Sequence, residues 1–93
     1  MEFAKRPEAE GFLEPVDWVK LDIPLYPNII KNPMDLGTIK GKLDRAEYSS
    51  IFHFDKDMRL IWNNAKKFNR PGSNIYKSAE YLRRDGIGIE YFV

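Results

Sequence analysis

The sequence contains no cysteine and only one histidine, His53. It therefore has no disulfide framework and no thiolate zinc site, and it suits a reducing compartment. A single histidine between Phe52 and Phe54 is more typical of a structural residue than of a catalytic base. No glycine-rich phosphate loop and no metal-ligand spacing is present in the sequence. We expect a protein that is not an enzyme and needs neither a metal nor another cofactor.

The sequence also lacks a long apolar run and a signal-peptide pattern, so it predicts neither a membrane span nor secretion. Fifteen basic and fourteen acidic residues give a formal net charge of +1. This balance does not favour tight binding to nucleic acid or to a membrane surface. With 43% hydrophobic residues in a chain of 93, residues 1–93 are expected to form one globular domain.

Apolar residues recur at helical spacing in the second half of the chain. Steps of three and four residues predict a central amphipathic helix. Ser49 or Ser50 can cap its start. The stripe consists of Ile51, Phe54, Met58, Ile61, Ala65 and Phe68.

Two further helices are expected beside the central one. Asp35 can cap a helix that starts at Leu36, and Ser73 can cap another that ends near Gly86 and Gly88. Short connections favour antiparallel neighbours, so the pattern predicts an all-α bundle.

Residues 10–34 are different in character. Pro15, Pro24, Pro27 and Pro33 are spaced too closely for a helix, yet the segment is too rich in apolar residues for a disordered linker. We expect an ordered loop with a short helical turn near 27–31. Loops of this length in a small domain are usually functional.

A second, short loop follows the central helix at Asn69, Arg70, Pro71 and Gly72. Asn69 has two interpretations. It can end the helix in the left-handed conformation that asparagine tolerates, or its amide can offer a donor and an acceptor to a ligand. In an antiparallel bundle both loops can lie at one end, where apolar groups and Tyr26 would form a pocket with few polar groups. Such a pocket suits a neutral, amide-bearing ligand.

The same residues carry a family resemblance. The matching segments are PVD at 15–17, IIKNPMDLGTI at 29–39 and FNRPG at 68–72. Over about residues 12–83 the chain resembles a bromodomain, an acetyl-lysine-binding module. The resemblance implies a left-handed four-helix bundle with helices Z, A, B and C, of which the outer helices Z and C are short here. It also implies a long ZA loop, here within residues 10–34, and a short BC loop, residues 69–73.

The resemblance also implies a binding site. The Asn69 amide would donate a hydrogen bond to the acetyl carbonyl, and Tyr26 would reach the same oxygen through a water. Glu10-Gly11-Phe12 stands where many members carry a Trp-Pro-Phe shelf, so only the phenylalanine is kept. The apolar lining would consist of Val16, Leu21 and Ile23 in the ZA loop, Phe68 before the asparagine, Ile75 as a gatekeeper on helix C, and Phe12.

The function implied is that of a nuclear chromatin reader that regulates transcription. Its partners would be acetylated histone tails or other acetyl-lysine peptides. The alternative is a degenerate bromodomain that serves only protein–protein contact. Because few residues precede Glu10, we also expect weak self-association that covers apolar surface.

Overall fold

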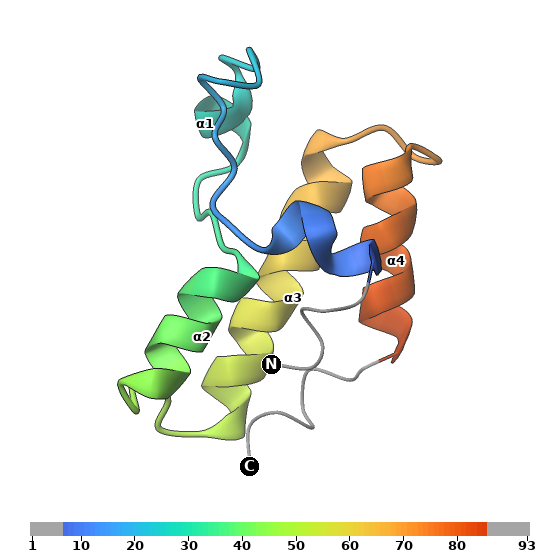
Figure 1. Cartoon of the computed structure of the whole chain (residues 1–93). Helices are drawn as coiled ribbons and strands as arrows, with labels where there is room; N and C mark the ends of the chain where they lie inside the picture. Colours follow the sequence, from blue (N-terminus) through green and yellow to red (C-terminus); the bar gives the residue numbers. More distant parts are fainter. Residues whose placement is uncertain (1–6, 86–93) are drawn as a thin grey trace.

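Figure 1 presents a computed structural model of the chain, which describes residues 7–85. All regular structure in this range is helical, which confirms the all-α bundle. The predicted end of the last helix at Gly86 and Gly88 lies outside the described residues. The elements are the 3-10 helix η2 (Pro7–Phe12), α1 (Tyr26–Ile29), α2 (Leu36–Asp44), α3 (Ile51–Phe68) and α4 (Asn74–Asp85).

Helix α3 is the centre of the bundle, with α2 and α4 packed against it and η2 lying across α3 and α4 (Figure 1). Phe54, Met58 and Ile61 of the predicted stripe are buried, whereas Ile51, in the first turn, is exposed. Trp62 lies beside the stripe and is nevertheless only 3% exposed. Its ring meets Phe12 of η2 edge-on at 5.2 Å, so the buried face is wider than the stripe predicted.

The helix starts confirm one predicted cap and correct another. Asp35 caps α2, since its carboxylate accepts hydrogen bonds from the Thr38 backbone N–H at 2.9 Å and the Thr38 hydroxyl at 2.6 Å. Ser50 occupies the N-cap position of α3, but its hydroxyl makes no capping bond. It lies 3.2 Å from Nδ1 of His53 instead, so the predicted side-chain cap is wrong there.

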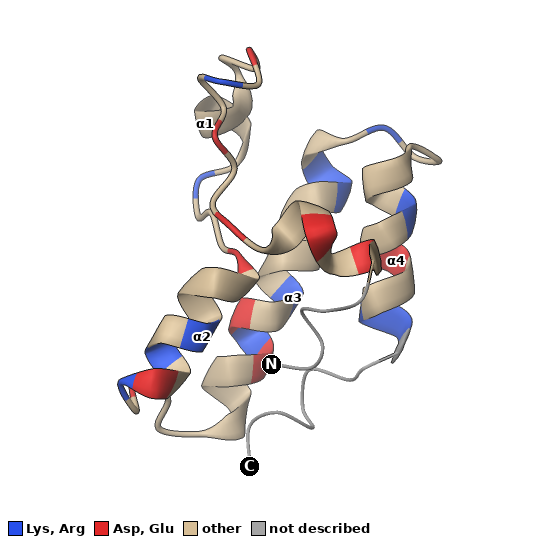
Figure 2. Cartoon of the chain, in the orientation of Figure 1, with Lys and Arg blue, Asp and Glu red and all other residues tan. Residues whose placement is uncertain are grey.

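Charged positions are distributed along the helices (Figure 2), and two ion pairs join neighbouring helices. Lys42 and Asp57 link α2 to α3 at 2.7 Å, and Lys66 and Glu80 link α3 to α4 at 3.1 Å. The Tyr48 hydroxyl donates to the same Asp57 carboxylate at 2.6 Å. Burial, together with this bond, raises the pKa of Tyr48 well above its ordinary value. These contacts fix α3 against both neighbours.

The ZA loop occupies residues 13–35 in the structure and runs from η2 to α2. The predicted helical turn within it is α1. The loop is tied down near both ends. The Gly37 N–H donates to the Leu13 carbonyl at 3.0 Å, and a Cβ on Gly37 would stand only 2.7 Å from that oxygen. At the other end, the Asn64 amide of α3 donates to the Asn32 carbonyl at 2.8 Å.

Candidate functional site

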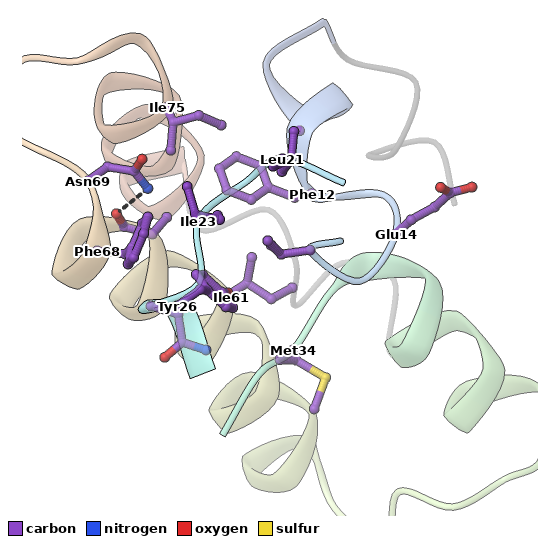
Figure 3. A pocket seen from close by; sticks show the side chains of 14 residues that line it. Phe12, Glu14, Leu21, Ile23, Tyr26, Met34, Ile61, Phe68, Asn69 and Ile75 are labelled. Atoms are coloured by element: carbon purple, nitrogen blue, oxygen red, sulfur yellow. Dashed lines mark hydrogen bonds between the residues drawn. The ribbon is translucent and has the colours of Figure 1, made fainter. Parts of the chain in front are cut away.

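A pocket of about 140 Å³ lies where the ZA loop meets the BC loop and the ends of α3 and α4 (Figure 3). The structure brings together around it all eight residues that the sequence indicated. They are Phe12, Val16, Leu21, Ile23, Tyr26, Phe68, Asn69 and Ile75. The sequence alone did not indicate six further lining residues: Gly11, Glu14, Met34, Ile61, Asn64 and Ala65.

Asn69 is the C-cap residue of α3 and at the same time lines the pocket. Its side-chain amide nitrogen, Nδ2, donates to the Ala65 carbonyl at 2.8 Å (Figure 3), and its backbone N–H donates to the same oxygen at 3.0 Å. The two interpretations of Asn69 are therefore compatible. One hydrogen of Nδ2 is used for capping, and an amide nitrogen carries two.

The backbone of Asn69 corrects one expectation. Its φ of −96° and ψ of 151° are extended, not left-handed. The left-handed residue of the BC loop is Gly72, with a φ of 87°. Because the Asn69 side chain itself satisfies the Ala65 carbonyl, the helix ends without a left-handed residue at this position.

The BC loop is closed by local bonds. The Ser73 N–H donates to the Arg70 carbonyl at 3.1 Å across the Pro71-Gly72 turn. The Ser73 hydroxyl then accepts from the Tyr76 N–H at 3.3 Å, which confirms the predicted cap of α4. These bonds fix the conformation of the BC loop and so the position of Asn69 relative to the first turn of α4.

Tyr26 lies at the base of the ZA loop and is 8% exposed. Its ring packs edge-on against Phe68 of α3, with the ring centroids 5.0 Å apart. Burial raises the pKa of the Tyr26 phenol above its ordinary value of 10.0. Within residues 7–85 this hydroxyl has no hydrogen-bond partner. It is therefore available to a water or a ligand in the pocket.

The apolar lining differs in exposure from one residue to the next. Val16 and Ile23 are half-buried, whereas Leu21 is 62% exposed and forms the rim of the pocket rather than a wall. Phe12 belongs to the buried core. Ile75, on α4, lies opposite Gly11 of η2, and a Cβ on that glycine would stand 2.8 Å from Cδ1 of Ile75.

Asn64 has two roles in the site that the sequence did not indicate. It lines the pocket and joins α3 to the ZA loop through its bond to the Asn32 carbonyl. A signal was present, because Asn64 follows Ile61 by three residues and precedes Phe68 by four, which places it on the same side of α3. The adjacent Asn63 is exposed.

Residues 7–85 show neither a metal site nor a membrane-spanning helix. No group of three or more histidine or carboxylate side chains in this range is arranged to hold a metal ion. None of the helices in the same range has the length and apolar character needed to cross a membrane.

Comparison with known proteins gives the family. The family model named Bromodomain matches residues 1–81. Over 73 residues the chain is 49% identical to "Transcription factor GTE11" of Arabidopsis thaliana, covering 78% of this chain and 12% of that protein. It is 50% identical over 64 residues to "Bromodomain-containing factor 1" of Candida albicans, covering 69% of this chain and 9% of that protein. The protein of the same name from Saccharomyces cerevisiae is 46% identical over 76 residues, covering 82% of this chain and 11% of the relative.

The family match includes all the residues that line the pocket, although the chain spans only 9–12% of the length of these relatives. A family match over most of the chain and an all-helical bundle point to one conclusion. The chain belongs to the bromodomain family, whose members are reader modules for acetylated lysine.

Proposed function

We propose that this domain, residues 1–93, is a chromatin reader. It binds acetylated lysine of histone tails, or of other nuclear proteins, in the pocket between the ZA and BC loops. The observation that carries the proposal is the Asn69 amide, which lies at an apolar pocket together with the Tyr26 hydroxyl.

The pocket would distinguish acetyl-lysine from unmodified lysine by the absence of a positive charge. An unmodified ammonium group would lose its hydration among apolar side chains, and this costs several kcal/mol or more if no partner compensates. Acetylation removes the charge, so the same side chain can enter. No Lys or Arg side chain and only one carboxylate, that of Glu14, belong to the lining, and Glu14 is exposed at the rim.

Within the pocket, the acetyl carbonyl would accept a hydrogen bond from the second hydrogen of the Asn69 amide nitrogen. The bond to the Ala65 carbonyl fixes the direction of that amide. A single bond of this kind contributes about 0.5–1.5 kcal/mol net. With a small pocket, the binding free energy should lie at about −4 to −8 kcal/mol, in the millimolar to micromolar range.

Tyr26 would contribute through an ordered water between its hydroxyl and the same carbonyl oxygen. Its ring is held against Phe68, so the hydroxyl keeps one position. A bridging water can be nearly as favourable in enthalpy as a direct bond.

The alternative is a degenerate bromodomain that makes only protein–protein contacts. The presence of both Asn69 and Tyr26 in the pocket favours the reader. The proposed location is the nucleus, in line with relatives named as transcription factors.

The test is a titration of the chain with histone-tail peptides, each in a mono-acetylated and an unmodified form, followed by NMR chemical shifts. Acetylated peptides should move the signals of Asn69 and Tyr26, whereas unmodified peptides should not. An equal response to both forms would favour the degenerate alternative.

A further inference from the structure

A second hollow of about 330 Å³ lies beside the proposed acetyl-lysine pocket. It is formed by Glu10 and Gly11 at the end of η2 and by residues 13–17 of the ZA loop, together with Leu21. Four residues line both hollows: Gly11, Glu14, Val16 and Leu21. The two hollows are therefore adjacent, and a peptide anchored in the first would extend either over the second or away from it.

The second hollow, which we name the side groove, differs from the pocket in its chemistry. Leu13, Pro15, Val16 and Leu21 give it apolar lining, and three exposed carboxylates, those of Glu10, Glu14 and Asp17, line it as well. No lysine or arginine lines it.

The carboxylates of the side groove are largely uncompensated. Glu10 and Glu14 make no ion pair or hydrogen bond with any residue of the range 7–85. Asp17 accepts only the Lys20 backbone N–H, at 3.1 Å. The three groups are not arranged to hold a metal ion. Apolar side chains together with exposed carboxylates match an amphipathic cation, whose methylene stem packs against apolar groups while its charged head stays in contact with water.

The opposite side of the pocket has the reverse charge. Figure 2 shows basic positions at the end of α3, in the BC loop and on α4, among them the exposed Arg70 and Lys77. A cationic residue of a bound peptide is therefore attracted to the side groove and repelled from the BC side. This asymmetry would favour one direction of the peptide across the pocket.

We propose that the side groove is a subsite for an unmodified lysine or arginine close in sequence to the acetyl-lysine. The inference rests on the proposed function. It makes the chain a reader of one acetyl-lysine beside a retained positive charge. Acetylation of that neighbour removes the charge that the carboxylates attract, so a doubly acetylated peptide binds less tightly.

The experiment compares three peptides of equal length by calorimetry, each with one central acetyl-lysine. In the first, the flanking residues are lysines; in the second they are norleucines, which keep an apolar stem without a charge; in the third they are acetyl-lysines. The lysine peptide should bind about two- to fivefold more tightly than either of the others, as expected for exposed charge pairs. The difference should shrink when the salt concentration is raised to about 1 M.

Matched variants of the chain assign this preference to the side groove. Glu10→Gln with Glu14→Gln keeps the shapes of the side chains and removes two charges, so the ratio between the lysine and norleucine peptides should fall close to one. Asp22→Asn removes one charge from the same loop at a position that lines neither hollow. In this variant the ratio of the affinities for the lysine and norleucine peptides should stay unchanged.

The outcomes separate the two proposals. If the norleucine peptide binds and the lysine peptide binds no better, the side groove is not a subsite, while the acetyl-lysine function stands. A preference that persists in the doubly substituted variant, or tighter binding of the triply acetylated peptide, also overturns the inference. If none of the three peptides binds, the proposed function itself is wrong.

Discussion

The two loops that form the pocket are built by different means. The BC loop spans residues 69–73 and is closed by bonds between near neighbours, around a proline-glycine turn. The ZA loop spans residues 13–35 and is fixed by contacts with residues distant in sequence, such as Gly37 and Asn64. It also exposes large apolar side chains: Trp18, Val19, Leu21 and Leu25.

The two loops therefore contribute different parts of the pocket. The BC loop places one polar group, Asn69, by short-range geometry. The ZA loop supplies half of the apolar lining, namely Val16, Leu21, Ile23, Tyr26 and Met34, together with the charged rim. The shape of both depends on where the loop is tied to the helices. Changes at the ties should therefore alter the pocket without unfolding the bundle, whereas changes in the core should remove both loops together.

The largest effect should come from the core that both loops share. Phe54 on α3 is 0% exposed, and Phe54→Ala should lower the free energy of unfolding by about 3–5 kcal/mol through lost burial and a cavity. Phe52→Ala is the matched control, because Phe52 lies on the same helix and is 81% exposed. Chemical denaturation measures both. Equal stability of the two variants would contradict the assignment of α3 as the core helix.

The next effect should separate the ZA loop from the bundle. In Gly37→Ala, the new Cβ would meet the Leu13 carbonyl oxygen at 2.7 Å, so the start of the loop must move, at a cost of about 1–3 kcal/mol. Gly41→Ala, on the same helix, meets only the flexible end of Arg45 and should be neutral or slightly stabilising. Hydrogen exchange should show lost protection at Gly37 in the first variant. Unchanged protection there would mean that the loop is held elsewhere.

Asn69 tests the BC loop. Asn69→Ala removes a capping bond and should lower stability by no more than about 0.5–2 kcal/mol, yet acetyl-lysine binding should become undetectable because it is weak from the start. Asn69→Asp should bind equally poorly, since a carboxylate has no N–H to donate. The control is Asn63→Ala, an exposed amide on α3 outside the pocket. Wild-type affinity of the Ala variant, measured by peptide titration, would leave Asn69 with the capping role alone.

The contact between Gly11 and Ile75 joins η2 and α4 at the pocket. Gly11→Ala should displace the Ile75 side chain and weaken acetyl-lysine binding, because Cδ1 of Ile75 would stand 2.8 Å from the new Cβ. Ile75→Val removes that atom, so the double variant should recover part of the loss. We expect a coupling energy of at least about 0.5 kcal/mol in the double-mutant cycle of binding affinities. Strict additivity would exclude the contact as the cause.

The smallest effect should come from Tyr26→Phe, which removes one hydroxyl and keeps the ring against Phe68. Binding should weaken modestly, whereas Tyr81→Phe on α4 should leave it unchanged. Because burial raises the Tyr26 pKa, the group's contribution to stability is complete below pH 10 and is lost as the pH rises through the higher folded-state pKa. The phenylalanine variant should lack this part of the alkaline loss in a pH series of melts. Identical affinity and identical pH series would reduce Tyr26 to a packing residue.

Features set by near neighbours could be predicted from the sequence. The Asp35 cap, the Gly72 turn and the burial of Phe54, Met58 and Ile61 each depend on residues within one or two helical turns. The eight lining residues came from the family resemblance, which carries long-range information that periodicity does not.

Features that depend on how a particular side chain is used in the folded bundle could not be predicted. Leu21 lines the pocket as expected, but its position at the rim, with 62% of the residue exposed, is not indicated by any sequence pattern. The role of Asn64 depends on the position of Asn32 at the far end of the same loop. The extended backbone of Asn69 follows from the use of its own amide as the cap, a choice that the sequence pattern leaves open.

The bond from the Asn69 amide to the Ala65 carbonyl has a consequence for the entropy of binding. A free asparagine side chain would lose rotational freedom when a ligand arrived, which costs about 0.5–1.5 kcal/mol per immobilised side chain. In this chain that freedom is already lost when α3 forms, so the proposed anchor is preorganised before any peptide is present. For a site with one direct hydrogen bond, the saving is as large as the bond itself.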